Sequence, residues 1–321
     1  MALLALTARL AAGQSSALPT RGDLMLRAGR VRAAETQFYA AARHRPRDPR
    51  ARLALGRYLA ARGALRVGAV LLEEARYFGG DSAAVARELA PVYARLDDYA
   101  ALIALPRSPL SAAERERAAW LRDHPPAVVG DDSVTVAFAP APGAGPVIGT
   151  FRALVGGEAV TIAVDASIAG WVLDPAMGQA AATRLFGAAT VVPGRTVGVA
   201  DVRIGRLSLV NVPVRFGPAP AAAAVRRPPE LAAVRVGLDV LGAFAPTFDA
   251  GAAVLTLRGD GRVRGARRGA ARVPAVLSTD GVYVPAGDAL VSLATARGRR
   301  VVPEARRWTF DRRRGEIVVE R

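Results

Sequence analysis

A spacing of 34 residues recurs in the first third of the chain, and it constrains the fold more than any other feature. Small or apolar residues stand at both ends of this spacing in several pairs. Such a period is typical of stacked helix–turn–helix units, in which small residues lie where two helices cross closely and larger ones fill the seams. The pairs are Gly22 and Gly56, Gly29 and Gly63, Ala34 and Gly68, Phe38 and Leu72, Ala41 and Ala75, and Pro46 and Gly80.

The period resembles that of the tetratricopeptide repeat. The stretch ARLALGRYLAARGALRVGAVLLEEARYFGGD reads as a helix, a turn at Gly63 and a second helix lined by Gly68, Leu72 and Ala75. We therefore expect a short α-helical solenoid over residues 15–124. Its expected role is to bind a polypeptide or protein partner; the alternative is a packing appendage of the following domain.

The composition excludes several kinds of chemistry. The 321-residue chain has no Cys, which excludes thiol nucleophiles, disulfides and thiolate metal sites. Its 44 basic residues are all Arg, so a P-loop or a Schiff-base lysine is excluded as well. The two histidines, His44 and His124, stand in Pro-flanked loop sequences, which argues against a catalytic triad or a histidine metal site. Carboxylate chemistry, or no chemistry, remains, and we expect no metal and no cofactor.

The net charge of +16 invites a nucleic-acid partner, but its origin argues against one. Arg, Ala, Gly and Pro are all abundant, which is typical of a GC-rich coding sequence. Aromatic residues make up 6% of the chain and do not alternate with basic ones as in base-stacking surfaces. We therefore expect no nucleic-acid partner. The chain also has no run of about 18 apolar residues, so we expect no transmembrane segment.

The second half of the sequence has β character. Ser111 and Glu114 form a capping-box pattern at the start of one more helix, and residues 125–146 read as a linker. Gly156 and Gly157 then separate two strand-like runs, as in a β-hairpin. We expect a small all-β domain over residues 147–258 and a β-rich C-terminal extension over residues 259–321, so that the fold class is α followed by β.

In the run VTIAVDASIAGWVLDP, Asp165 is the one carboxylate before Asp174, and it stands in an apolar stretch. It resembles the catalytic strand-turn of single-lobe, retropepsin-like aspartic proteases, in which apolar residues precede Asp-Thr-Gly-Ala-Ser. Asp165 takes the place of the catalytic Asp, and Gly170 agrees with the pattern. Two later runs, VADVRIGRLSLVNVPVRF and VRVGLDVLGAFAPTFDAGAAVLTL, resemble the strand pair after the flap and the second signature in bacterial members.

This resemblance implies an all-β acid-protease barrel and an aspartic-type endopeptidase. One lobe carries one catalytic Asp, so a working site would need a homodimer in which two Asp165 side chains share a proton and activate a water. Gly237 would let the second signature pass close to the catalytic turn, and Asp239 follows it. Residues 190–199 would form the flap. For Asp239 the alternative is a turn or helix-start residue.

The sequence departs from the family pattern at two positions of the catalytic turn. Ala166 replaces the Thr whose hydroxyl bonds to the partner turn, and Ser167 replaces the Gly. Three interpretations of Asp165 therefore stay open: a catalytic carboxylate in a divergent peptidase, a remnant in an inactive, partner-binding pseudoprotease, or a strand-end Asp of an unrelated β domain. The C-terminal extension shows no second Asp-Thr-Gly pattern, and it either adds to the dimer contact or covers the cleft.

The N-terminal run MALLALTARLAAGQSSALP has an interrupted apolar stretch and small residues before a possible cleavage point. Many proteins with this domain arrangement are exported. We therefore expect an exported or periplasmic location, with the cytoplasm as the alternative.

Overall fold

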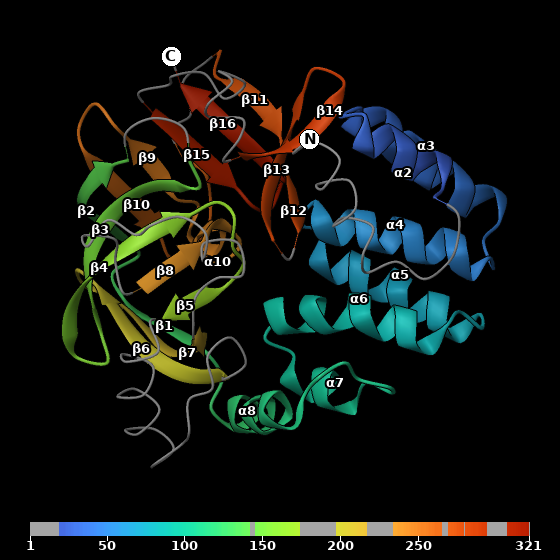
Figure 1. Cartoon of the computed structure of the whole chain (residues 1–321), viewed down its shortest axis with the longest axis horizontal. Coiled ribbons are helices and arrows are strands. Elements are labelled where there is room, and N and C mark those ends of the chain that lie inside the picture. Colours follow the sequence, from blue (N-terminus) through green and yellow to red (C-terminus); the bar gives the residue numbers. More distant parts are fainter. Residues whose placement is uncertain are drawn as a thin grey trace. The chain divides into compact units, whose positions relative to one another are not determined.

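The computed structural model describes residues 19–141, 145–173, 197–216, 234–264, 269–278, 280–293 and 307–320. The chain divides into two compact units. The first comprises residues 1–109 together with 285–291 and is mainly helical, and the second comprises residues 110–284 and 292–321 and is rich in sheet. The expected order of helices followed by strands is therefore present (Figure 1).

The helical unit is built from successive helices that pack as antiparallel neighbours, with α2 on α3, α4 on α5 and α5 on α6 (Figure 1). The predicted helix–turn–helix is present as α4 and α5, with Gly63 at φ +87° in the connecting turn. Asp48, Asp81 and Asp98 cap three of the helices with their side chains, which explains where these helices begin. The helices are α2 (Arg21–Arg27), α3 (Val31–His44), α4 (Pro49–Ala61), α5 (Leu65–Tyr77), α6 (Ser82–Arg95) and α7 (Tyr99–Ala104).

Two glycines of the repeat meet where α4 crosses α5. A Cβ atom on Gly56 would lie 3.0 Å from the carbonyl oxygen of Gly68, and one on Gly68 would lie 2.9 Å from that of Gly56. The backbones therefore touch, and a larger side chain would separate the two helices. Gly56 and Gly68, which the 34-residue spacing singled out, therefore set the closest approach of this helix pair.

Helix α8 (Ala112–Asp123) belongs to the sheet-rich unit, although we expected residues up to 124 to form the repeat domain. Its predicted capping box is present, because the Ser111 side chain accepts from the Glu114 N–H and the Glu114 side chain accepts from the Ser111 N–H. Helix α8 packs against strand β6 (Val197–Ile204) of the same unit.

The segment expected to be a linker contributes two strands to the main sheet. Strand β1 (Ala127–Gly130) pairs with β7, and β2 (Ser133–Pro140) pairs with β3 and β10. The reason lies in the alternation of SVTVAF, which buries Val134 and Phe138 on one face of β2. The linker interpretation gave more weight to the Pro- and Gly-rich end of the segment than to this alternation.

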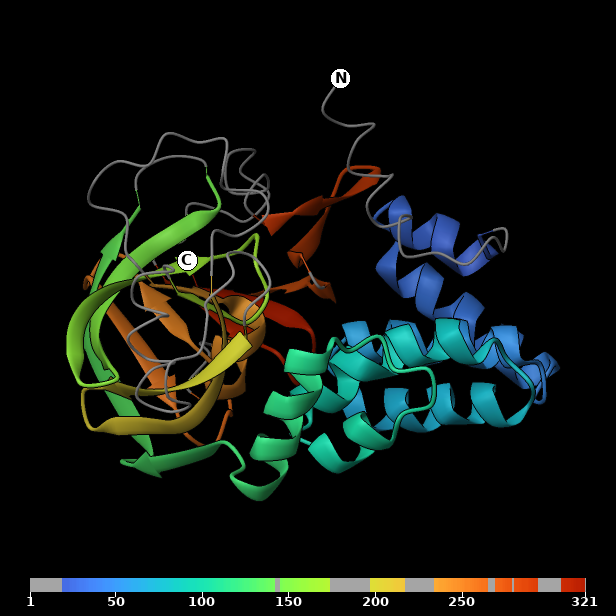
Figure 2. The ribbon, with the colours of Figure 1, turned by 60° about the horizontal axis from the view of Figure 1, so that its bottom comes forward.

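The main sheet follows the order β1-β7-β5-β8-β4-β3-β2-β10-β9-β15-β16-β11. Strand β6 pairs with both β3 and β7, so the pairing runs in a closed ring through β7, β5, β8, β4 and β3 (Figure 2). The predicted hairpin is present, with Gly156 and Gly157 at positive φ between β3 and β4. The further elements are β3 (Val147–Val155), β4 (Glu158–Asp165), β5 (Trp171–Leu173), β6 (Val197–Ile204), β7 (Leu207–Phe216), β8 (Val234–Gly237), α10 (Leu238–Leu241), the 3₁₀ turn η1 (Gly242–Phe244), β9 (Thr247–Asp249), β10 (Val254–Arg258), β11 (Ala271–Pro274), β15 (Arg307–Asp311) and β16 (Glu316–Glu320).

The C-terminal extension forms the strands that the sequence predicts. Strands β15 and β16 join the main sheet beside β9. Strands β12 (Val276–Ser278), β13 (Gly281–Ala286) and β14 (Ala289–Ser292) form a separate three-stranded sheet. Among the helices that the structure describes, each is too short or too polar to cross a membrane.

Candidate functional site

The turn after β4 brings together the residues that the sequence singled out. Strands β4 and β8 run parallel, with Asp165 directly opposite Gly237. The Gly237 N–H donates to the carbonyl oxygen of Gly170 at 2.9 Å. A side chain on Gly237 would overlap the carbonyl oxygen of Ile168, so this close passage requires glycine.

Asp239 ties the second signature to the same turn. Both of its carboxylate oxygens accept the N–H of Gly170, at 2.9 and 3.0 Å, and Gly170 has φ +78°. Asp239 lies in the first turn of α10, which is the helix-start position that we weighed as its alternative role. Its carboxylate therefore holds the turn against α10.

The carboxylate of Asp165 is buried, with the residue 1% exposed. Its Oδ1 accepts two hydrogen bonds from Ser167, from the backbone N–H at 2.9 Å and from the hydroxyl at 2.7 Å. Ser167, one of the two departures from the family pattern, thus binds Asp165 within its own turn. Ala166, the other departure, is fully buried.

Arg235 is the functional neighbour that the sequence analysis missed. It lies in β8, and its Nη1 is 3.5 Å from Oδ2 of Asp165, with the Arg235 side chain 12% exposed. Removing one partner of an ion pair with so little exposure is strongly destabilising, because the other charge then stays buried and uncompensated. The signal was present in the sequence, since Arg235 is the one charged residue within VRVG, but the parallel pairing that places it beside Asp165 could not be read from spacing.

The C-terminal extension also contacts this turn, through strand β13. The N–H of Val282 in β13 donates to the carbonyl oxygen of Ala166 at 3.2 Å, and Val282 is buried. Strand β13 of the extension thus contacts this turn within the same chain, and the two roles that we left open for the extension stay predictions. The predicted flap falls mostly outside the described residues: only positions 197–199 are described, and they belong to β6.

This arrangement stabilises a negative charge without presenting it to solvent. A carboxylate that activates water must reach that water, and a proton-sharing pair needs a second carboxylate close by. Here one oxygen of Asp165 is held by Ser167 and the other faces Arg235. The geometry is that of a buried ion pair that fixes a turn.

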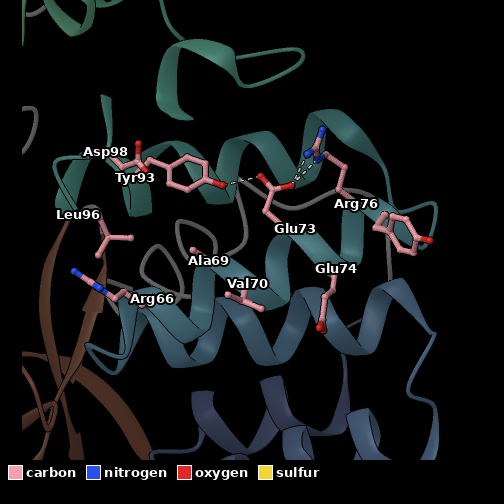
Figure 3. Close-up of a pocket in the computed structure, with 10 residues that line it drawn as sticks. Arg66, Ala69, Val70, Glu73, Glu74, Arg76, Tyr93, Leu96 and Asp98 are labelled. Carbon is pink, nitrogen blue, oxygen red and sulfur yellow. Dashed lines mark hydrogen bonds and ion pairs between the residues drawn. The ribbon is translucent and has the colours of Figure 1, made fainter. Parts of the chain in front are cut away.

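A second candidate site lies in the helical unit, in a surface groove of about 790 Å³ between α5 and the C-terminal end of α6 (Figure 3). Three large apolar side chains are exposed along α5: Val67 by 54%, Val70 by 59% and Tyr77 by 85%. Val70 and Tyr77 line the groove, and Val67 lies about one turn before Val70 on the same helix. Such a row of exposed apolar side chains on one helix is unusual on a free surface.

The polar residues of this groove are held in fixed positions. Glu73 accepts a hydrogen bond from the Tyr93 hydroxyl at 2.7 Å and pairs with Arg76 at 2.6 Å (Figure 3). Burial is the main cause, and the hydrogen bond to Glu73 the second, of a pKa of the Tyr93 phenol above its usual range. The Tyr93 hydroxyl therefore stays a hydrogen-bond donor at all physiological pH values. Glu74 pairs with Arg52 of α4 at 3.0 Å. The groove is therefore ordered before any ligand binds.

The chain was compared with known proteins after this geometry was established. No protein-family model and no curated protein matches it. Among solved structures, a retropepsin-like aspartic protease from Rickettsia conorii is similar, with 15% sequence identity and a TM-score of 0.26 over 41% of this chain and 91% of that chain. This is a distant relationship in fold, and at these values it carries no argument about activity.

Proposed function

We propose that this chain is a non-catalytic polypeptide-binding protein. In this proposal the helical unit binds an apolar polypeptide segment in the α5–α6 groove, and the Asp165 turn is a structural part of the sheet-rich unit. The observation that carries the proposal is the exposed row of Val67, Val70 and Tyr77 beside a preordered groove. The burial of Asp165 and its pairing with Arg235 support the loss of chemistry at the turn.

The groove favours a polypeptide with apolar side chains. Aliphatic and aromatic groups on one helix give contact area without charge, whereas the two glutamates of the groove are already paired with Arg52, Arg76 and Tyr93. A partner that brings apolar groups removes the exposed Val70 and Tyr77 from water without disturbing these pairs. Helical-repeat domains commonly bind extended or helical segments on such surfaces.

Val70→Glu is expected to weaken this binding at least about tenfold, because it places an unpaired charge in the apolar part of the groove. The measurement is fluorescence anisotropy of a labelled, permanently unfolded polypeptide, such as reduced and carboxymethylated α-lactalbumin, titrated with the full chain. Val129 is exposed by 57%, close to the 59% of Val70, so Val129→Glu is the matched control and should bind as the wild type does. Equal binding by wild type and Val70→Glu would reject the groove as the site.

The second candidate is a divergent aspartic endopeptidase in which Asp165 activates the water. It is favoured by the N–H of Ser167 at 2.9 Å from Asp165 Oδ1 and by the close passage of Gly237, because both are expected of a strand-turn that presents a carboxylate. This candidate requires the ion pair with Arg235 to open and a second chain to supply another Asp165. Cleavage of an unfolded substrate distinguishes it from the binding protein.

A further inference from the structure

We propose that strand β13 is a built-in cover of the Asp165 turn, so that another strand could bond to the backbone of Ala166 only by displacing it. The proposal goes beyond polypeptide binding by the helical unit and does not depend on it. It concerns residues 165–168 and residues 276–284 of strands β12 and β13, all of which lie in the sheet-rich unit.

The first support is a backbone-to-backbone contact that only glycine permits. Gly281 begins β13 at φ +124°, a conformation that side-chain-bearing residues rarely adopt. A Cβ atom there would overlap the carbonyl oxygen of Ala166 and lie 3.0 Å from the Cα of Ser167. The strand therefore lies directly on the backbone of the turn.

The second support is that β13 forms a hydrogen bond with the backbone of the turn, at Ala166. The Ala166 carbonyl accepts the N–H of Val282, and the Ala166 N–H donates to the carbonyl oxygen of Pro146 at 2.8 Å. Both backbone groups of Ala166 are thus satisfied within one chain. An incoming strand would have to displace β13 to bond at this residue.

The third support is that the covering hairpin is held together by contacts between its own residues. Strand β12 pairs with β13 in register from Val276 opposite Tyr283 to Ser278 opposite Gly281. The Tyr283 hydroxyl donates to Asp280 at 2.8 Å, and Tyr283 is buried. The hairpin is therefore a defined structural element whose position over the turn can be tested.

The test is hydrogen exchange on the full chain with Gly281→Val. The branched side chain cannot fit between β13 and Ala166, so exchange should become at least about tenfold faster in peptides covering residues 165–168 and 281–284, while helices α4 and α5 exchange as in the wild type. Gly287→Val is the matched control. Gly287 also has a positive φ, +62°, but a Cβ atom there meets nothing within 4 Å, so the turn should stay protected.

Sedimentation velocity on the wild-type chain completes the test, and we expect a monomer with a protected turn. Gly281→Ala, which adds one methyl group at the same contact, serves if Gly281→Val does not fold, and it should speed exchange in the same two segments. Unchanged exchange in the glycine variants would overturn the proposal. So would a wild-type dimer that loses protection of residues 165–168 on dilution, because a second copy would then be the cover. Neither readout depends on polypeptide binding, so this inference and the proposed function can fail separately.

Discussion

Asp165→Asn should destabilise the sheet-rich unit by about 3–5 kcal/mol, because it removes a negative charge that pairs with the guanidinium of Arg235 in a buried place. Asparagine keeps the shape of the side chain and an oxygen that can accept from Ser167, so the loss reports the missing charge. The measurement is urea unfolding followed by tryptophan fluorescence, since Trp171 is buried in β5 beside β8.

Two further variants test whether the ion pair is the cause. Arg235→Met in the Asp165→Asn background removes the other charge of the pair and should recover most of the lost stability. Asp131 forms a surface pair with Arg206, with side chains 54% and 86% exposed, so Asp131→Asn should change the free energy of unfolding by less than about 0.5 kcal/mol. If Asp165→Asn were neutral or stabilising, Asp165 would be a residue retained for activity at a cost in stability.

Gly68→Leu should destabilise the helical unit by about 2–3 kcal/mol, because its side chain would enter the contact between α4 and α5. The first atom of that side chain would lie 2.9 Å from the carbonyl oxygen of Gly56 and 3.0 Å from the Cβ of Ala60. Leucine is the better helix former by nearly 1 kcal/mol, so the packing penalty must exceed that gain. Denaturation followed by the helical circular dichroism signal measures the difference.

Val67→Leu is the control for this helix. Val67 is one position away in α5 and more than half exposed, so the same final side chain at that position should leave stability unchanged within about 0.5 kcal/mol. A Gly68→Leu protein as stable as the wild type would show that the α4–α5 crossing tolerates separation, and that the repeated glycines do not set the distance between the helices.

Local signals predicted the elements of the fold well. The Ser111–Glu114 capping box, the turn at Gly63 and the hairpin at Gly156–Gly157 are all present, because each depends on neighbours only a few residues away. The strands within residues 127–140 were missed, since their partners β7, β3 and β10 lie elsewhere in the chain.

The candidate site was predictable in its members but not in its chemistry. One turn brings together the residues that the resemblance pointed to, which are Asp165, Gly170, Gly237 and Asp239. Arg235 is 70 residues from Asp165 in the sequence, and the contact exists only because β4 and β8 are parallel neighbours in this register. The approach of β13 depends in the same way on tertiary structure. The sequence therefore did not reveal that Asp165 is buried and paired with an arginine, or that β13 contacts its turn.

Cleavage of a denatured protein across pH 3 to 7, with wild type and Asp165→Asn compared side by side, tests the central claim most directly. We expect neither protein to cleave the substrate at any pH, with both samples shown to be folded under the assay conditions. Cleavage by the wild type that is lost in Asp165→Asn would contradict the account, because it would place a working catalytic carboxylate in the turn that we describe as structural.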